Sequence, residues 1–479
     1  MTLDITPTNH QWDAIKSATI WFEDARKHFV HNPVPDDDDP EAWAEYTPSR
    51  MVHGISEGQV FVLAGYAGSG KSTCVASLVD SLALQQNEVM YMAPTGKAAK
   101  VLSEKLRAAG WYAPATTIHK AIYMPQTQKS AEIKDQLDRV DTEWDARSDA
   151  AEKGTPDARF LFEHLNNHEL QVLINKLENE LSDAMDNEGI SFSLKDQKHL
   201  PDGVKLIVVD EASMVGTDIA DDLAAFNLPI LAIGDPGQLP PIEGAHGFDM
   251  EHPDVFLTEI HRQAAENPII HLATLARQGE LIKPGTYGDT VRVLRRRDDN
   301  ATLDMESDAM VLVGTHNKRF AITTAIRNAL GIKSTGPIKD EPILVQRNSR
   351  EYPALVNGSI LNCTKDVGDL ENGGVVIELC MQDPEQDSLD YKVRCPQALF
   401  EEHHFKKRNS YSGPMKQVYS AKANLEQLDW GHAITVHKAQ GSEWDSVVLH
   451  DESGVFRGAG DRWLYTGITR AKNELTLIV

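Results

Sequence analysis

The chain has 479 residues, of which 72 are acidic and 47 basic, so its net charge at pH 7 is −25; 41% of its residues are hydrophobic. These values are ordinary for a soluble globular protein of about three domains. No apolar run approaches the roughly 20 residues that cross a bilayer, and the first residues lack the order of a secretory signal. We therefore expect a cytoplasmic protein with no membrane partner.

Charge and cysteine usage narrow the classes of partner and metal site only a little. The acidic balance argues weakly against a nucleic-acid partner, because a groove that follows a phosphate backbone needs only a local basic lining. The cysteines show no C-x-x-C spacing and no nearby pair of His residues, so they predict reduced thiols and neither a zinc site nor disulfides. They are Cys74, Cys363, Cys380 and Cys395.

Apolar residues recur at helical spacing from Ile5 to Phe22 and predict a helix. Gln11 lies near the start of this helix. A single glutamine on a helix is more often a surface residue than a ligand, so its role depends on the motifs that follow.

The apolar run Val60–Leu63 predicts a strand, and it is followed by the pattern G-x-x-x-x-G-K-S and then by a helical pattern. In such a loop the glycines let backbone N–H groups point at a phosphate, and the helix adds its positive end. Lys71 would supply a charge to the phosphates, and the Ser72 hydroxyl would bind Mg²⁺. A plain Gly/Ser-rich turn is the alternative, which the flanking strand and helix disfavour. The residues predicted to bind the nucleotide are Gly65, Ala67, Gly68, Ser69, Gly70, Lys71, Ser72 and Thr73.

A second strand-to-helix junction follows, with a strand at Glu88–Ala93 and a helix that opens at Thr95–Lys100. Such junctions lie on the rim of an open sheet where ligands bind. The segment Thr116–Lys120 gathers hydroxyls, an imidazole and an amine, and a capped helix is the equally weighted alternative. Residues 125–199 are rich in charged side chains with leucines at helical spacing, which predicts an inserted helical module.

A buried strand at Val204–Val209 ends in Asp210 and Glu211. One carboxylate can hold Mg²⁺ and the next can deprotonate the attacking water, so we assign these roles to Asp210 and Glu211 in that order. A solvent-facing acidic turn is the alternative.

The strand Pro229–Gly234 leads into a proline-stiffened loop that presents Gln238, which can sense a terminal phosphate. A structural turn would have a similar sequence. The segment Leu257–Gln263 then carries Arg262 among apolar neighbours.

The second half predicts another sheet-and-helix domain, without a second phosphate loop. Its expected strands are Met310–Gly314, Ser446–His450 and Leu475–Val479, and a helix is expected at Thr315–Leu330. Glycine turn signals between short β-branched runs predict a β-rich insertion at 342–429.

Together these motifs resemble superfamily 1 DNA helicases, most of all the RecD/Dda-like subgroup. The resemblance implies an α/β fold with two RecA-like P-loop NTPase domains that contain parallel sheets. We place the first domain at 1–124 and 200–283, the second at 284–341 and 430–479, the helical insertion at 125–199 and a β-rich, SH3-like insertion at 342–429. The segments that carry the resemblance are GYAGSGKST, APTGKAAKVL, TTIHKAIY, VVDEASMV, GDPGQLPPI, LTEIHRQ, ITVHKAQGSEWDSV and YTGITRAK.

The resemblance also assigns residues. Gln11 matches a glutamine that reads adenine, and Arg262 and Arg470 match arginines that reach the γ-phosphate. Two features depart from the family: the spacer between Gln11 and Gly65 is long, and 125–199 looks helical and acidic where relatives carry a strand-separating hairpin. The residues that match DNA-facing positions are Thr95, Lys97, His119, Thr435 and His437.

We therefore expect an ATP-dependent DNA helicase or translocase with ATP and Mg²⁺ as cofactors, serving replication, recombination or repair in a bacterial or phage-infected cell. The resemblance implies 5′→3′ movement on single-stranded DNA, action at single/double-strand junctions and contact with replication or recombination proteins. Two alternatives stay open: an ATP-driven binding switch without unwinding, and a helicase subunit of a larger recombination complex. Because the chain ends directly after a core strand, we expect a stand-alone motor.

Overall fold

The structure is a computed structural model of the chain. It describes residues 7–29, 54–126, 140, 173–174, 177, 191–195, 200–201, 203–241, 245–258, 267–296, 309–349, 352, 355–370, 376–384, 390–397, 399–400 and 425–479, without the side chains of residues 72, 73, 76, 125, 126 and 191–193. The chain divides into one unit of residues 1–122, 195–407 and 426–479 and another of residues 123–194 and 408–425. None of the described helices is long and apolar enough to cross a membrane.

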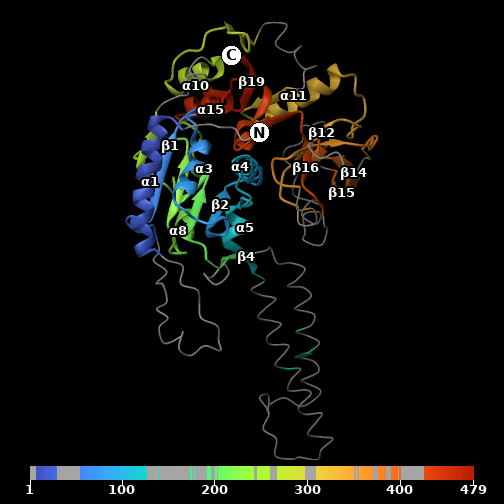
Figure 1. The fold of residues 1–479 in the computed structure, drawn as a ribbon. Helices are drawn as coiled ribbons and strands as arrows, with labels where there is room; N and C mark the ends of the chain where they lie inside the picture. Colours follow the sequence, from blue (N-terminus) through green and yellow to red (C-terminus); the bar gives the residue numbers. More distant parts are fainter. Residues whose placement is uncertain are drawn as a thin grey trace, which may run out of the picture. The chain divides into compact units, whose positions relative to one another are not determined.

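The first half builds a six-stranded parallel sheet in the order β3-β2-β6-β7-β1-β8 (Figure 1). Its central strands are buried apolar runs, as expected where helices cover both faces of a parallel sheet. The predicted strands are confirmed, with shifts of one or two residues at their ends. The strands are β1 (Val60–Gly65), β2 (Val89–Ala93), β3 (Thr116–Thr117), β6 (Leu206–Val209), β7 (Ile230–Gly234) and β8 (Val255–Leu257).

Helix α1 (Asn9–His28) packs against α3 (Lys71–Ser81) and against β1 and β8. It continues beyond the predicted end at Phe22, because Ala25 is still buried and three basic residues in its last turn suit the negative end of the helix dipole. Phe22 is fully buried in this core, which stabilises the fold by about 1.5–3 kcal/mol. The remaining elements are α4 (Gly96–Ala108), α5 (Ile118–Ile122), α8 (Thr217–Ala224) and the 3₁₀ turns η1 (Gln86–Glu88) and η3 (Ala212–Met214).

The second half builds a six-stranded sheet in the order β17-β11-β18-β19-β10-β9, parallel except for the edge strand β9. Its core gathers Trp463, Leu312 and Leu449 against α10 and α15. The strands are β9 (Gly285–Tyr287), β10 (Val291–Leu294), β11 (Met310–Val313), β17 (Ala433–Thr435), β18 (Trp444–His450) and β19 (Ala471–Ile478), and the helices are α10 (Pro268–Arg277), α11 (His316–Ala329), α14 (Val436–Ala439), η5 (Ser453–Val455) and α15 (Gly460–Ile468).

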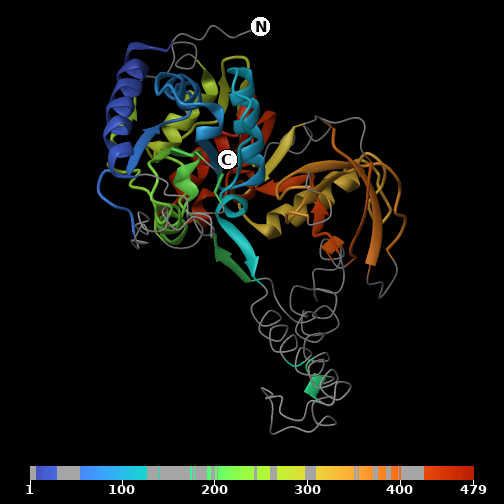
Figure 2. The same cartoon turned by 60° about the horizontal axis from the view of Figure 1, so that its bottom comes forward.

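The predicted β-rich insertion is an antiparallel five-stranded sheet in the order β15-β14-β13-β12-β16, drawn in orange and red in Figure 2. Alternating burial along β14 and β15 gives it one buried face, lined by Leu379 and Val393. Its likeness to an SH3 module stays a prediction. The strands are β12 (Pro342–Val345), β13 (Ile360–Cys363), β14 (Val376–Gln382), β15 (Asp390–Pro396) and β16 (Leu428–Trp430).

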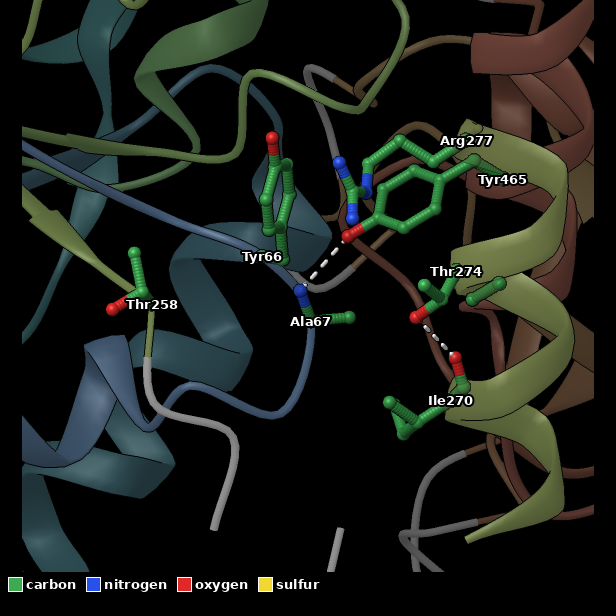
Figure 3. A pocket seen from close by; sticks show the side chains of 8 residues that line it. Tyr66, Ala67, Thr258, Ile270, Thr274, Arg277 and Tyr465 are labelled. Atoms are coloured by element: carbon green, nitrogen blue, oxygen red, sulfur yellow. Dashed lines mark hydrogen bonds between the residues drawn. The ribbon is translucent and has the colours of Figure 1, made fainter. Parts of the chain in front are cut away.

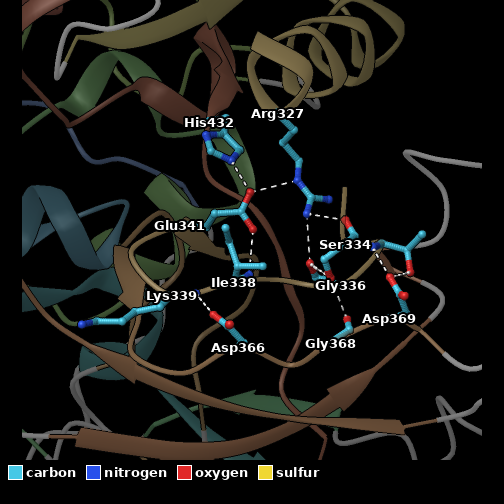
Figure 4. Close-up of polar contacts among 11 residues, drawn as sticks. Arg327, Ser334, Gly336, Ile338, Lys339, Glu341, Asp366, Gly368, Asp369 and His432 are labelled. Carbon is cyan, nitrogen blue, oxygen red and sulfur yellow. Dashed lines mark hydrogen bonds and ion pairs between the residues drawn. The ribbon is translucent and has the colours of Figure 1, made fainter. Parts of the chain in front are cut away.

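A buried polar cluster joins α11 to this insertion (Figure 4). Arg327 Nε lies 2.9 Å from Glu341 Oε1, and His432 Nε2 lies 3.0 Å from the same oxygen. The Arg327 guanidinium also donates to two backbone carbonyls, Ser334 O and Gly336 O, and lies 4.0 Å from the ring centre of Trp430. The charge is thus compensated although the side chain is only 3% exposed.

The segment predicted as a helical insertion begins and ends in strands. Strand β4 (Tyr123–Gln126) pairs antiparallel with β5 (Ser191–Leu194), and the two lie side by side in Figure 2. The residues that the structure describes between them, 140, 173–174 and 177, are helical. Most of this insertion lies outside the described residues.

Candidate active site

A cavity of about 620 Å³ lies at the carboxyl ends of β1, β6 and β7, within the size range of small-molecule sites. Both sheets supply its walls. Lys71, Asp210, Glu211 and Gln238 come from the first half, and Glu443 and Arg470 come from the second half. Most of the predicted catalytic residues are therefore brought together in one place.

The phosphate loop leads directly from β1 into α3. Gly68 and Gly70 have φ of +81° and +78°, which side chains rarely adopt, so the loop needs glycine at both positions. The residue before α3 is Gly70, which has no side chain to accept a hydrogen bond from the first N–H groups of the helix. The first N–H groups of α3 are therefore available to a phosphate, and the positive end of the helix faces the cavity.

Backbone carbonyls of the phosphate loop hold the Lys71 side chain in place. Its Nζ donates to Gly65 O at 2.6 Å and to Tyr66 O at 3.1 Å, and it lies 3.8 Å from Asp235 Oδ2. The side chains of Ser72 and Thr73, predicted to bind Mg²⁺ and nucleotide, lie outside the described atoms.

Asp210 and Glu211 follow β6 on a sharp turn. Glu211 has φ of +53°, and its N–H donates to Asp210 Oδ1 at 2.9 Å. Burial raises the pKa of Glu211 above its ordinary value and Asp210 adds to this, while Arg470 and Lys71 oppose it. A carboxyl with a raised pKa is better matched to accepting a proton near neutral pH.

Gln238 is almost fully buried, and its Oε1 has no hydrogen-bond partner among the described atoms. An amide oxygen left unpaired beside a polar cavity is suited to bind a water or a ligand there. Asp235 fixes the loop that carries Gln238, because its Oδ1 accepts the N–H of Gly237 at 2.9 Å.

Arg470 reaches the cavity from the segment between α15 and β19, and it is 3% exposed. Its guanidinium donates to Thr466 O at 3.0 Å, to Ser442 O at 3.1 Å and to Thr469 Oγ1 at 3.1 Å. Neutral oxygen atoms thus orient the guanidinium group and do not neutralise its charge. Arg262, the other predicted arginine, lies outside the described residues.

Gln11 is buried against the phosphate loop. Its Nε2 donates to Ser69 O at 3.0 Å, and its Oε1 accepts the N–H of Thr8 in a capping box at the start of α1. This places Gln11 next to the phosphate loop and ties α1 to it. Its reading of adenine stays a prediction.

Sequence reasoning missed Tyr465 on α15, whose hydroxyl accepts the N–H of Ala67 at 2.8 Å (Figure 3). A second, smaller cavity of about 150 Å³ adjoins this contact. Arg277 lines it, with its guanidinium 3.7 Å from the ring centre of Tyr66. The position of Tyr465 within YTGITRAK was the only available signal.

Four threonines cap helices at the ends of strands in the two sheets. In the first sheet Thr95 comes shortly after β2 and Thr117 is the last residue of β3; in the second, Thr315 comes shortly after β11 and Thr435 is the last residue of β17. β3 and β2 are the first two strands at one edge of the first sheet, and β17 and β11 are the first two at one edge of the second. Threonine-capped helix starts therefore occur in both halves, and such N-termini favour phosphate, but at Thr315 the N–H groups of Gly314 and Thr315 already donate to the Glu452 carboxylate. Thr315 was not singled out from the sequence.

The other predicted DNA-facing residues lie near these helix starts. Lys97 Nζ lies 4.5 Å from the ring centre of Trp444, across the two halves. His119 is exposed on α5, and His437 lies 5.3 Å from the ring of Phe456. Burial lowers the pKa of His437, which favours its neutral form.

Among the described residues, no cluster of three His, Cys, Asp or Glu side chains is arranged to hold a metal ion. Mg²⁺ does not require such a cluster, because it usually binds one or two carboxylates together with substrate phosphates. Asp210 fits that pattern.

Residues 49–298, more than half of the chain, match the family model of the AAA domain, and residues 431–478 match that of the UvrD-like helicase C-terminal domain. An ATP-dependent RecD2 DNA helicase of Deinococcus radiodurans is 25% identical over 460 residues, 90% of this chain and 50% of that protein. An uncharacterized protein of Methanocaldococcus jannaschii is 23% identical over 496 residues, 90% of this chain and 37% of that one. The chain thus spans half or less of these curated relatives.

Solved structures with a similar trace include two helicases. The Pif1 helicase from Candida albicans is 14% identical with a TM-score of 0.45, and the match covers 99% of this chain and 94% of that one. A Bacteroides Pif1 bound to ssDNA is 17% identical with a TM-score of 0.41, with 88% and 89% covered.

Proposed function

The chain belongs to the AAA-domain family of P-loop proteins, among the RecD-like superfamily 1 helicases, and we propose that it is an ATP-dependent DNA helicase. The observation that carries this proposal is the shared cavity. Lys71 and Glu211 from one sheet and Arg470 from the other line the same space, so the cavity is complete only when both halves contribute. A motor that converts hydrolysis into movement of two domains needs such a composite site.

ATP and Mg²⁺ fit the residues that surround this cavity. The start of α3, the positive-φ glycines and Lys71 would hold the phosphates, and Asp210 would hold the metal. The sequence motif assigns the Ser72 hydroxyl to the same metal. When bound, Mg²⁺ would neutralise charge on the phosphate oxygens.

Each side chain at the cavity has its own role in the proposed hydrolysis. Glu211 accepts the proton of the attacking water, and Gln238 orients that water through its unpaired amide oxygen. Lys71 and Arg470 stabilise negative charge as water adds to the γ-phosphate and the bond from that phosphate to the departing ADP breaks. The products are ADP and inorganic phosphate, and their departure releases the contact between the two halves.

Single-stranded DNA is the proposed partner along the paired helix N-termini. The helix starts that Thr95 and Thr117 cap in one half and Thr435 caps in the other would present backbone N–H groups to phosphates, which positions a strand without reading its sequence. Movement in the 5′→3′ direction follows from the resemblance to the RecD-like subgroup.

A strand-displacement assay tests the proposal on duplexes with a 5′ or a 3′ single-stranded tail. We expect ATP-dependent unwinding of the 5′-tailed duplex and none with Lys71→Ala, which lacks the phosphate-binding charge. Unwinding of the 3′-tailed duplex alone would contradict the proposed 5′→3′ direction of movement. DNA-stimulated ATP turnover without unwinding of either duplex would favour an ATP-driven binding switch.

A further inference from the structure

Tyr465 is a buried polar side chain that reaches from one half of the protein to the other. It lies on α15 and is 2% exposed. Its hydroxyl accepts the N–H of Ala67 in the phosphate loop at 2.8 Å (Figure 3). The same hydroxyl donates to Asp235 Oδ2 at 2.7 Å. Its ring packs so closely on Gly237 that a Cβ there would approach it to 2.9 Å.

Tyr465 is also connected to Arg470 through a short path. The next residue, Thr466, accepts the Nε–H of Arg470 on its carbonyl at 3.0 Å. The hydroxyl of the same threonine accepts the N–H of Leu239, just after Gln238, at 3.0 Å. The start of this path is fixed on the phosphate loop and its end carries the guanidinium.

We propose that Tyr465 is a positioning residue that docks α15 on the phosphate loop and thereby fixes Arg470 at the bond that is broken. The inference rests on the proposed ATP hydrolysis and adds a residue that acts through the arginine. Burial and the neighbouring Asp235 raise the pKa of the Tyr465 hydroxyl well above its ordinary value, so it stays protonated and keeps donating to that carboxylate.

Tyr465→Phe tests this with little change in shape, because the ring stays in its apolar surroundings. A displacement of about 1 Å in a catalytic group such as the Arg470 guanidinium can lower the rate on the order of 10²-fold. We therefore expect the DNA-stimulated kcat of Tyr465→Phe to fall at least about tenfold, while its ADP affinity and its KM for ATP stay unchanged. Tyr287→Phe is the matched control. It removes a tyrosine hydroxyl that, among the described residues, donates to Lys283 O at 2.8 Å, and it should leave kcat unchanged.

A double-mutant cycle with Arg470→Lys separates positioning from general stabilisation. If Tyr465 acts through Arg470, Tyr465→Phe costs little in the Arg470→Lys background, because the group it positions has already lost its planar fork. Independent, additive losses would overturn the inference, and so would a wild-type kcat in Tyr465→Phe. Absence of ATP turnover in the wild-type protein would instead contradict the proposed function.

Discussion

Arg327 and Arg470 are equally buried, yet their surroundings differ in kind. Arg327 pairs with Glu341 and stacks on Trp430, so its charge is neutralised within the fold. Arg470 is held by neutral oxygens and, within the part of the chain that the structure describes, forms no ion pair with a carboxylate. An arginine oriented in this way leaves its charge for a ligand in the cavity, which supports a catalytic role for Arg470 and a structural one for Arg327.

Glu341→Gln is expected to destabilise the fold strongly. Breaking a buried pair leaves the charge of Arg327 uncompensated, which typically costs about 3–5 kcal/mol in the free energy of unfolding. Chemical denaturation followed by tryptophan fluorescence would measure it.

Glu378→Gln is the control. The ion pair between Glu378 and Lys392, on β14 and β15, also spans 2.9 Å, but both of its side chains are exposed. We expect its unfolding midpoint to match the wild type. Equal losses in both variants would show that burial of the Arg327 pair does not set its contribution.

Lys71, Asp210 and Glu211 could be predicted from the sequence because strand, loop and helix determine such sites locally. Tyr465 and Asp235 could not be paired, because 230 residues separate them and only the tertiary fold brings them to 2.7 Å. The same holds for Gln11: its helical position was evident, but its bond to Ser69 depends on how α1 packs.

At the scale of elements, the loop after α14 and the start of α4 come very close. Gly441 has φ of +73°, and a Cβ there would meet Ala98 Cβ at 2.9 Å and Thr95 Oγ1 at 3.0 Å. These contacts cross between the two halves beside the cavity. Only a glycine allows the loop to approach the helix N-terminus this closely.

Gly441→Ala should therefore lower DNA-stimulated ATP turnover, because the added methyl group holds the two halves apart. Gly458→Ala is the matched control: Gly458 has the same φ of +73°, and nothing lies within 4 Å of its Cβ position. Both variants should lose about 1–2 kcal/mol of unfolding free energy to backbone strain. Turnover should fall in Gly441→Ala alone, and equal turnover in the two variants would rule out the close approach.

Elements with strong periodicity were predictable, and those defined by pairing were not. Buried apolar runs such as Leu206–Val209 predict strands because parallel sheets covered on both faces are built from near-continuous runs of this kind. Strands β4 and β5 were missed because each is four residues long, with its partner more than sixty residues away. The end of α1 was placed too early because, beyond Phe22, Ala25 is the one buried residue of the helix, so the apolar periodicity fades before His28.

At the scale of the molecule, the proposed hydrolysis depends on two sheets together. The first carries the phosphate loop and both carboxylates, the second carries Arg470, and hydrogen bonds that involve Tyr465 and Thr466 hold them in contact. The net charge of −25 does not conflict with the proposed DNA partner, because phosphates need only local contacts, which backbone N–H groups at helix starts and Lys97 would supply.

Steady-state ATP hydrolysis by Arg470→Lys, measured with and without single-stranded DNA, tests this composite site most directly. Lysine keeps the charge but loses the planar fork that Thr466, Ser442 and Thr469 orient. An arginine in this role contributes on the order of 10³ to 10⁵ in turnover, so we expect a folded protein with near-normal ATP and DNA affinity and DNA-stimulated turnover reduced at least about tenfold. Undiminished turnover in a correctly folded Arg470→Lys protein would contradict a site completed by the second half of the chain.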